Sequence, residues 1–206
     1  MNKYNLFEKI SIYFAIFIFM TFMLLPFVEM FYASLRPLKH LFRSPYQFYS
    51  DDLSFWAYKE MWNTVPMLGR YIFNSFFLAT CVAIITLLFV IPAAYSYARF
   101  SFPGKNSSLY LFLAVNMFAG PVLLIPLYKV LRTLGLLNSY QAMIIAGVAF
   151  LLPTSIWLLK SYFEKIPIEL EEAAFCDGAS RLQILRHVIT PLSTPGLVVV
   201  GLYAFI

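Results

Sequence analysis

The chain has 206 residues, of which 61% are hydrophobic, 19% aromatic and only 12% charged. A soluble globular domain carries about 45–50% apolar and about 25% charged residues, so this chain has too few charges to cover a surface in water, and its solvent is lipid. The net charge of +5 does not indicate nucleic acid, because the 15 Lys and Arg residues are scattered between apolar runs.

The apolar residues gather into four long runs and a fifth that ends with the chain. A membrane-spanning helix needs about 20 residues, because it crosses about 30 Å of hydrocarbon. The predicted spans are, in chain order, residues 10–32, 71–97, 109–128, 142–159 and the shortened run 196–206. This pattern predicts an all-α, polytopic membrane helix bundle.

The first run has a competing interpretation as a cleaved signal peptide, because Lys3 and Lys9 precede it. The apolar part of a signal peptide has about 7–15 residues and is followed by small residues, whereas this run is longer and ends in bulky ones. We therefore expect a retained helix, kinked at Pro26.

The segment between the first two predicted spans is long and polar, but its residues 53–62 are rich in apolar and aromatic side chains. These are Leu53, Phe55, Trp56, Met61 and Trp62. Because Trp favours the headgroup region of a membrane, the segment predicts a short amphipathic helix lying at the interface.

The last run is too short to cross a bilayer as a helix, and nothing polar or helix-stopping ends it. We therefore expect a C-terminally incomplete chain whose fifth span is cut short. The orientation of the bundle is not fixed by charge. With the N-terminus inside the cell, the 15 Lys and Arg residues divide almost evenly between the two sides, and the positive-inside rule needs a clearer bias.

Residues 160–195, here called the elbow, form a long polar stretch between the fourth and fifth predicted spans. Pro167 suits the first turn of a helix, and the carboxylates of Glu169, Glu171 and Glu172 follow where the helix dipole favours negative charge. Gly178 comes after this first helix, at the position where a left-handed residue is expected.

A second elbow helix is predicted to begin at Ser180, because Ser180 and Gln183 have the spacing of a capping box. The apolar residues spaced to share one face of this helix are Leu182, Leu185 and Ile189. Pro191 and Pro195 are expected to end it.

Two interpretations of the elbow remain open on this basis: an ordinary surface loop, or a docking element for another protein. Loops of this length are usually functional or disordered, and two helix signals argue against disorder. Ala173 and Ala174 add small side chains that let a partner approach the backbone closely.

The elbow resembles the EAA motif of ABC importer permeases. Glu172, Ala173 and Ala174 are followed after three residues by Gly178, as in the motif. The family pattern continues nine residues beyond the Gly with Ile, one residue, then Leu-Pro. The corresponding residues here are Val188, Thr190 and Pro191, so the Pro is in register and Thr190 in place of Leu is the departure.

Residues 94–106, 126–142 and 162–180 also resemble the sugar-importing branch of this family, and the resemblance covers essentially the whole chain. It is closest to the maltose-type permease with six spans. It implies the fold of a type I ABC importer permease, with five of six spans begun here. Residues 1–206 would then form one transmembrane permease domain in the bacterial cytoplasmic (inner) membrane.

The resemblance further implies a cytoplasmic elbow that docks into a groove of an ATPase subunit. The residues it assigns to this coupling are Glu172, Ala173, Ala174, Asp177, Gly178, Ser180 and Pro191. The implied partners are a second permease subunit, a pair of ATP-binding subunits, an extracytoplasmic solute-binding protein and a sugar substrate.

The chain itself is expected to have no catalytic site and to bind no cofactor or metal. It contains no GxxxxGK[ST] phosphate loop, so ATP and Mg are expected on the partner ATPase. Cys81 and Cys176 have no CxxC spacing and no His cluster beside them. The two histidines, His40 and His187, are assigned no catalytic role.

Asn74 and Asn116 are candidate residues of the substrate pathway, because polar side chains within spans tend to face a cavity or a neighbouring helix. A hydrogen bond between helices is the alternative for each. For the whole chain, the alternatives are an ABC permease for a non-sugar solute and a secondary transporter. A secondary transporter would lack the elbow and often carries ionisable residues at mid-span.

Overall fold

The computed structural model describes residues 6–37, 53–117 and 120–206, and the regular structure in these ranges is helical. His40 lies outside the described residues. The chain divides into two compact units, Met1–Gly69 and Arg70–Ile206. The elbow belongs to the second.

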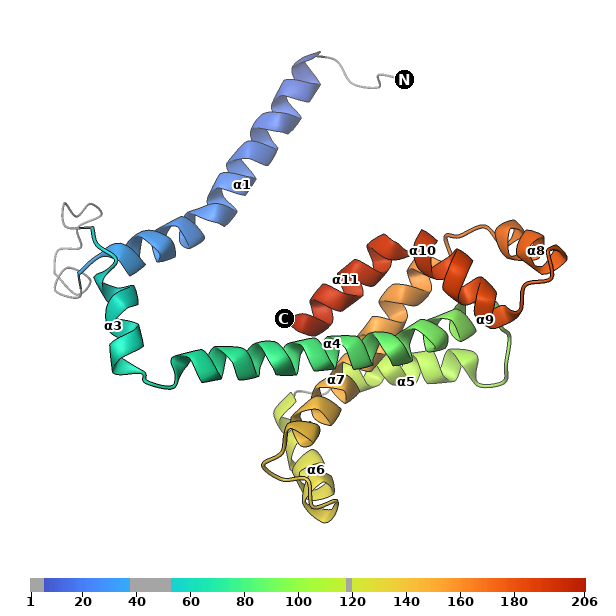
Figure 1. Cartoon of the computed structure of the whole chain (residues 1–206). Helices are drawn as coiled ribbons and strands as arrows, with labels where there is room; N and C mark the ends of the chain where they lie inside the picture. Colours follow the sequence, from blue (N-terminus) through green and yellow to red (C-terminus); the bar gives the residue numbers. More distant parts are fainter. Residues whose placement is uncertain (1–5, 38–52, 118–119) are drawn as a thin grey trace. The chain divides into compact units, whose positions relative to one another are not determined.

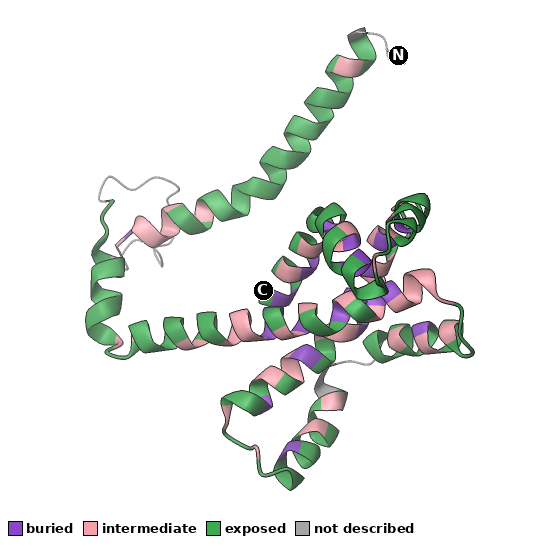
Figure 2. Ribbon diagram, turned by 45° about the vertical axis from the view of Figure 1, so that its right-hand side comes forward, coloured by how far each residue is buried: buried purple, intermediate pink, exposed green. Residues whose placement is uncertain are grey.

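The first unit contains α1 (Leu6–Leu35) and α3 (Trp56–Thr64). Helix α1 falls on the predicted span 10–32 and continues past Pro26. Its apolar side chains are exposed along most of its length (Figure 2), as expected of a helix in lipid. Helix α3 confirms a helix in the interfacial segment, and a 2.8 Å hydrogen bond between the Ser34 and Tyr58 hydroxyls links it to α1.

The second unit contains the remaining helices, apart from the first two residues of α4 (Figure 1). The long ones are α4 (Leu68–Arg99), α5 (Lys105–Met117), α6 (Gly120–Thr133), α7 (Tyr140–Phe163) and α11 (Thr194–Phe205). The elbow holds α8 (Glu169–Cys176), α9 (Arg181–Ile184), the π-helix η1 (Leu185–Ile189) and α10 (Thr190–Leu192).

Among the described residues, α1, α4 and α7 are each long and apolar enough to cross a membrane. Two further candidates are bent pairs. The predicted span 109–128 falls on α5 and α6, which meet at 104°, and residues 181–192 meet α11 at 83°. Counting each pair as one span gives up to five.

Contacts within the second unit fix the direction of its helices. Val82 of α4 packs on Gly147 of α7, and Tyr95 packs on Phe163, so these two helices run in the same direction. Helix α5 runs against α7, because Leu109 near its start contacts Trp157 and Asn116 near its end contacts Thr154. Helix α11 runs against α4, because Gly201 lies near Leu87 and Phe205 packs on Phe76. Direction therefore alternates along α4, α5, α7 and α11.

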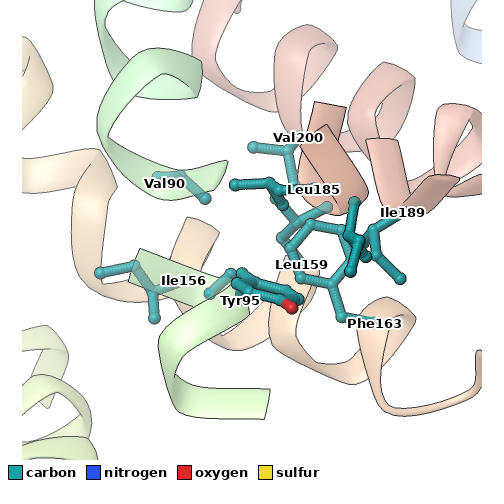
Figure 3. Packing of buried hydrophobic residues seen from close by; sticks show 10 residues of the cluster. Val90, Tyr95, Ile156, Leu159, Phe163, Leu185, Ile189 and Val200 are labelled. Carbon is teal, nitrogen blue, oxygen red and sulfur yellow. The ribbon is translucent and has the colours of Figure 1, made fainter. Parts of the chain in front are cut away.

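The buried core lies at one end of this bundle, where α4 and α7 end and the elbow begins; we call this the elbow end. Figure 3 shows Tyr95 of α4, Leu159 of α7 and Leu185 of the elbow packed within it. Its buried members are Val90, Ala94, Tyr95, Ile156, Leu159, Phe163, Ile184, Leu185, Ile189 and Val200. The elbow is thus part of the core and not a loop laid over it.

Candidate functional site

The first elbow helix ends as the sequence predicts. Gly178 has φ +82°, in the left-handed region. The N–H of Ala179 donates to the carbonyl of Ala174, and that of Gly178 donates to the carbonyl of Phe175, each at 3.0 Å. These two bonds form a Schellman motif, which satisfies the last carbonyls of α8 and turns the chain sharply. Helix α8 begins at Glu169, so Pro167 precedes it.

The second elbow helix begins at the predicted capping box. The side-chain oxygen of Gln183 accepts hydrogen bonds from the Ser180 N–H and from the Ser180 hydroxyl, both at 2.8 Å. One orphan backbone donor at the helix start is thereby satisfied.

The second elbow helix then widens into a π-helix over Leu185–Ile189. Thr190 closes this turn twice, because its N–H and its hydroxyl both donate to the Leu185 carbonyl, the hydroxyl at 2.6 Å. A π-turn adds a residue to the helical repeat and shifts the faces of the helix. The face predicted from ordinary spacing is therefore partly wrong: Leu185 and Ile189 are buried, but Leu182 is 74% exposed and Ile184 is buried in its place.

The sequence predicts that Pro191 ends the second elbow helix, and this prediction is wrong. Pro191 lies inside α10, and the break comes two residues later at Ser193, where the chain bends by 83° into α11. Pro191 lacks the N–H that an α-helix would require there, which is tolerated because the π-turn has already opened the hydrogen-bond ladder. Pro195 instead lies in the first turn of α11, after Thr194.

The residues of the EAA pattern lie mostly on the outer surface of the elbow. Glu172, Ala173, Asp177, Gly178 and Ser180 are exposed. Ala174 is half-buried and packs against the core. The turn between the two helices also borders a shallow hollow of about 320 Å³, lined by Asp177, Gly178, Ala179, Gln183, His187 and Val188. The structure therefore leaves most of the predicted coupling residues accessible around the turn, while Ala174 faces the core and Pro191 lies apart in α10.

Glu171 points in the opposite direction. Only 4% of its surface is exposed, and its two carboxylate oxygens accept hydrogen bonds from the Tyr95 hydroxyl at 2.8 Å and from Arg99 Nε. Sequence reasoning missed this role, because the helix dipole accounts equally well for all three glutamates of α8. The one local hint is that Glu169 and Glu172 already place negative charge at the start of α8, so the helix dipole does not require a third carboxylate.

The two asparagines proposed for the substrate pathway lie in different surroundings. Asn116, near the end of α5, accepts a 3.1 Å hydrogen bond from the Thr154 hydroxyl of α7 and donates to the Phe112 carbonyl. That arrangement matches the alternative of a bond between helices. Asn74 is half-buried near the start of α4.

Within the described part of the chain, there is no group of three or more His, Cys, Asp or Glu side chains arranged to bind a metal ion. Cys81 is half-buried in α4, and Cys176 is an exposed free thiol in the last turn of α8. His187 lies in η1, where its ring nitrogen is 3.1 Å from the Gln183 carbonyl.

Comparison with known proteins places this architecture in a family. An inner membrane ABC transporter permease protein of Escherichia coli is 33% identical over 207 residues, which cover 99% of this chain and 73% of the relative. This chain belongs to the ABC transporter permease family. The permease is accordingly a multi-pass protein of the inner membrane, and its apolar helices α1, α4 and α7 are suited to cross it.

Other relatives carry substrate names. A sulfoquinovosyl glycerol transport system permease protein of Agrobacterium fabrum is 34% identical, over 89% of the permease and 64% of the relative. A trehalose/maltose transport system permease protein of Thermococcus litoralis is also 34% identical, over 89% and 66%. The permease therefore spans only about two thirds of the length of these two relatives. No family model matches the chain.

A solved structure shares the fold. A chain of a bacterial ABC transporter involved in the import of the acidic polysaccharide alginate is similar to the permease with a TM-score of 0.75 and 27% identity. The similarity covers 98% of the permease and 71% of that chain. The elbow and the long helices thus have counterparts in a transporter of the same family.

Proposed function

We propose that the permease forms half of the translocation pathway of an ABC importer for a sugar or oligosaccharide, and that its elbow couples this pathway to a separate ATPase subunit. A second permease would supply the other half, and an extracytoplasmic solute-binding protein would deliver the solute. The sugar class is supported by the relatives, whose names include trehalose, maltose and sulfoquinovosyl glycerol transport. A non-sugar solute is the alternative.

One observation carries the coupling proposal: of two adjacent glutamates in α8, one is buried and the next is exposed. Glu171 is buried inside the permease, whereas Glu172 is exposed beside Ala173 and the Gly178 turn. An outward carboxylate next to a small side chain and a sharp turn offers a partner one polar contact and a close approach to the backbone. The elbow is also too well packed on the core to be an independent loop.

In the proposed coupling mechanism, the helix bundle has an inward-facing and an outward-facing arrangement. An ATPase can shift the balance between inward- and outward-facing states only if it contacts the elbow differently in the two. In this proposal the permease is not catalytic: ATP and Mg bind to the partner ATPase, and the permease supplies the moving contact. Exposed Glu172, Ala173, Asp177 and Gly178 would make that contact.

The native thiol of Cys176 gives a direct test, because it is exposed in the last turn of α8. In a Cys81→Ser background, a membrane-impermeant maleimide should label Cys176 in inverted vesicles stripped of ATPase subunits, but not in intact cells. Rebinding of the ATPase subunits should protect it. Labelling in intact cells would reverse the proposed orientation, and unprotected labelling at saturating ATPase would remove the elbow from the docking surface.

Charge reversal tests the same contact functionally. Glu172→Lys should reduce both the ATPase subunits retained on the membrane and the sugar uptake, with normal permease abundance. Glu169→Lys is the matched control, because Glu169 is an exposed glutamate of the same helix outside the motif. Equal retention in both variants would count against Glu172 as the docking carboxylate.

Uptake of labelled mono- and oligosaccharides, compared with a non-sugar solute panel, tests the substrate class.

A further inference from the structure

The last turn of α4 holds the start of the elbow by a buried ion pair. Arg99, the last residue of α4, donates from Nε to one oxygen of Glu171, and Tyr95 donates to the other at 2.8 Å. Tyr95 and Arg99 are four residues apart, so they lie on the same face of α4 and reach one carboxylate together. Both charged side chains are almost fully buried.

Arg99 also binds the segment that leads into α8. Its Nη2 donates a 2.8 Å hydrogen bond to the carbonyl of Ile166, between α7 and α8. One guanidinium therefore fixes both the first turn of α8 and the chain just before it. We call Tyr95, Arg99, Ile166 and Glu171 the Arg99 joint.

A second cation ties the far side of the elbow to the same place. The guanidinium of Arg181, the first residue of α9, lies 4.8 Å from the ring centroid of Phe100 and 5.4 Å from that of Phe175. Phe100 follows Arg99 directly, and Phe175 belongs to α8. Both elbow helices are thus connected to the end of α4, to which neither is joined in sequence.

These contacts connect the elbow helices to α4, to which the chain does not join them. The chain itself joins α8 to α7 through the short stretch 164–168, and the two elbow helices meet at a glycine turn. Separating a buried ion pair is costly, because it leaves an uncompensated charge in a medium of low dielectric constant. The elbow and the end of α4 are therefore expected to move together while the pair is intact.

We infer that the Arg99 joint is the connection through which movement of the elbow is transmitted to α4. Glu171 and Arg99 are positioning residues in this scheme, distinct from the exposed docking residues. The inference rests on the proposed coupling function, since it assigns the route by which an ATPase-driven displacement enters the membrane. Without the joint, the elbow would still dock, but only apolar packing would connect it to α4, and less of its movement would be transmitted.

The test separates docking from transmission. In the assembled transporter, reconstituted in vesicles with loaded binding protein, Glu171→Gln and Arg99→Lys should retain their ATPase subunits and hydrolyse ATP. Sugar uptake per ATP hydrolysed should fall about five-fold or more, the lower end of a typical coupling between sites. Glu169→Gln makes the same change on an exposed glutamate two residues before Glu171. It should leave this ratio unchanged.

A spectroscopic measurement distinguishes the joint from mere structural support. A spin label on Cys176 reports the elbow, and one at Leu88→Cys, on the exposed side of α4, reports the span; each is used without other cysteines. Addition of ATP should change the spectra of both labels in the parent protein. In Glu171→Gln the Cys176 label should respond as in the parent, while the response of the α4 label should be clearly smaller.

The outcomes are decisive in each direction. A Cys176 label that ignores ATP in the parent protein would refute the proposed coupling function itself. Normal uptake per ATP with both labels responding in Glu171→Gln would overturn the joint alone. Tyr95→Phe removes a single hydrogen bond and keeps the ion pair, so it should assemble. Loss of assembled transporter in both Tyr95→Phe and Glu171→Gln would assign the joint to assembly and also overturn the inference.

Discussion

The ring of Tyr162 in α7 lies directly against Gly196 in α11. A Cβ added to Gly196 would come to 2.6 Å from Cγ and 2.8 Å from Cδ2 of that ring. Real Cβ atoms do not approach an aromatic ring so closely, and the ring is large and its backbone is held by the core. The glycine is thus required by the close approach of two helices at the elbow end.

Gly196→Ala should therefore destabilise the permease. Overpacking of this kind costs about 1–3 kcal/mol, which a thermal unfolding curve of the detergent-solubilised protein would register as a lower midpoint. Gly201→Ala is the matched control in the same helix, because its nearest neighbour, Leu87 Cδ1, would be at an ordinary 3.5 Å. Equal midpoints for the two variants would show that Tyr162 can move aside freely.

The hydroxyl of Thr190 should stabilise the π-turn of the elbow. Thr190→Val keeps the branched shape but removes the 2.6 Å bond to the Leu185 carbonyl, so it should cost about 0.5–1.5 kcal/mol. Thr190→Ser keeps the hydroxyl and should retain most of the stability. Hydrogen exchange at the amides of η1 measures the effect locally. Faster exchange in the Ser variant than in the Val variant would contradict this account.

At Gly178, the effect of a substitution should depend on how readily the new residue adopts a positive φ, and not on the size of its side chain. A Cβ at this position would meet no atom within 4 Å, but φ +82° costs a residue with a Cβ about 1–2 kcal/mol. Gly178→Val should re-aim the exposed edge of α8 and lower both uptake and ATPase retention. Gly178→Asn should perform better, because Asn adopts this conformation more readily. Transport assays on both, at equal abundance, check the order.

Removing the hydrogen bond between Asn116 and Thr154 should lower the stability of the permease and leave its solute preference almost unchanged. Asn116→Ala and Thr154→Val each remove the same contact, so their destabilisations should overlap in the double variant. Bonds of this kind between membrane helices contribute about 0.6 kcal/mol. Sugar competition assays test the other role. If Asn116→Ala changes the sugar preference and Thr154→Val does not, Asn116 contacts the solute.

Local patterns in the sequence predict much of this structure, because they record local physics. The long apolar runs correspond to α1, α4 and α7, and Gly178 and the Ser180–Gln183 pair correctly mark the turn and the second elbow helix. Residues 109–128 fall on two helices, since hydropathy reports burial in lipid but does not report a bend.

The features that were missed depend on distant or irregular geometry. Glu171 and Arg99 are 72 residues apart, and local spacing gives no reason to pair them. Periodicity assumes 3.6 residues per turn, so the π-turn moved Leu182 to the surface and brought Ile184 inside. The same widening explains why Pro191 is carried within the helix, although an isolated proline is a sound sign of a helix end.

The separation of Arg99 from Glu171 also has a consequence for biogenesis. A chain grows at about 5–20 residues per second, so the guanidinium emerges about 4–14 s before the carboxylate that will bury it. During that interval the Arg99 guanidinium has no Glu171 carboxylate to pair with. In the orientation proposed above, Arg99 would then be a positive charge at the cytoplasmic end of a newly inserted apolar helix, where the positive-inside rule favours it, and it would be buried only once the elbow has been synthesised.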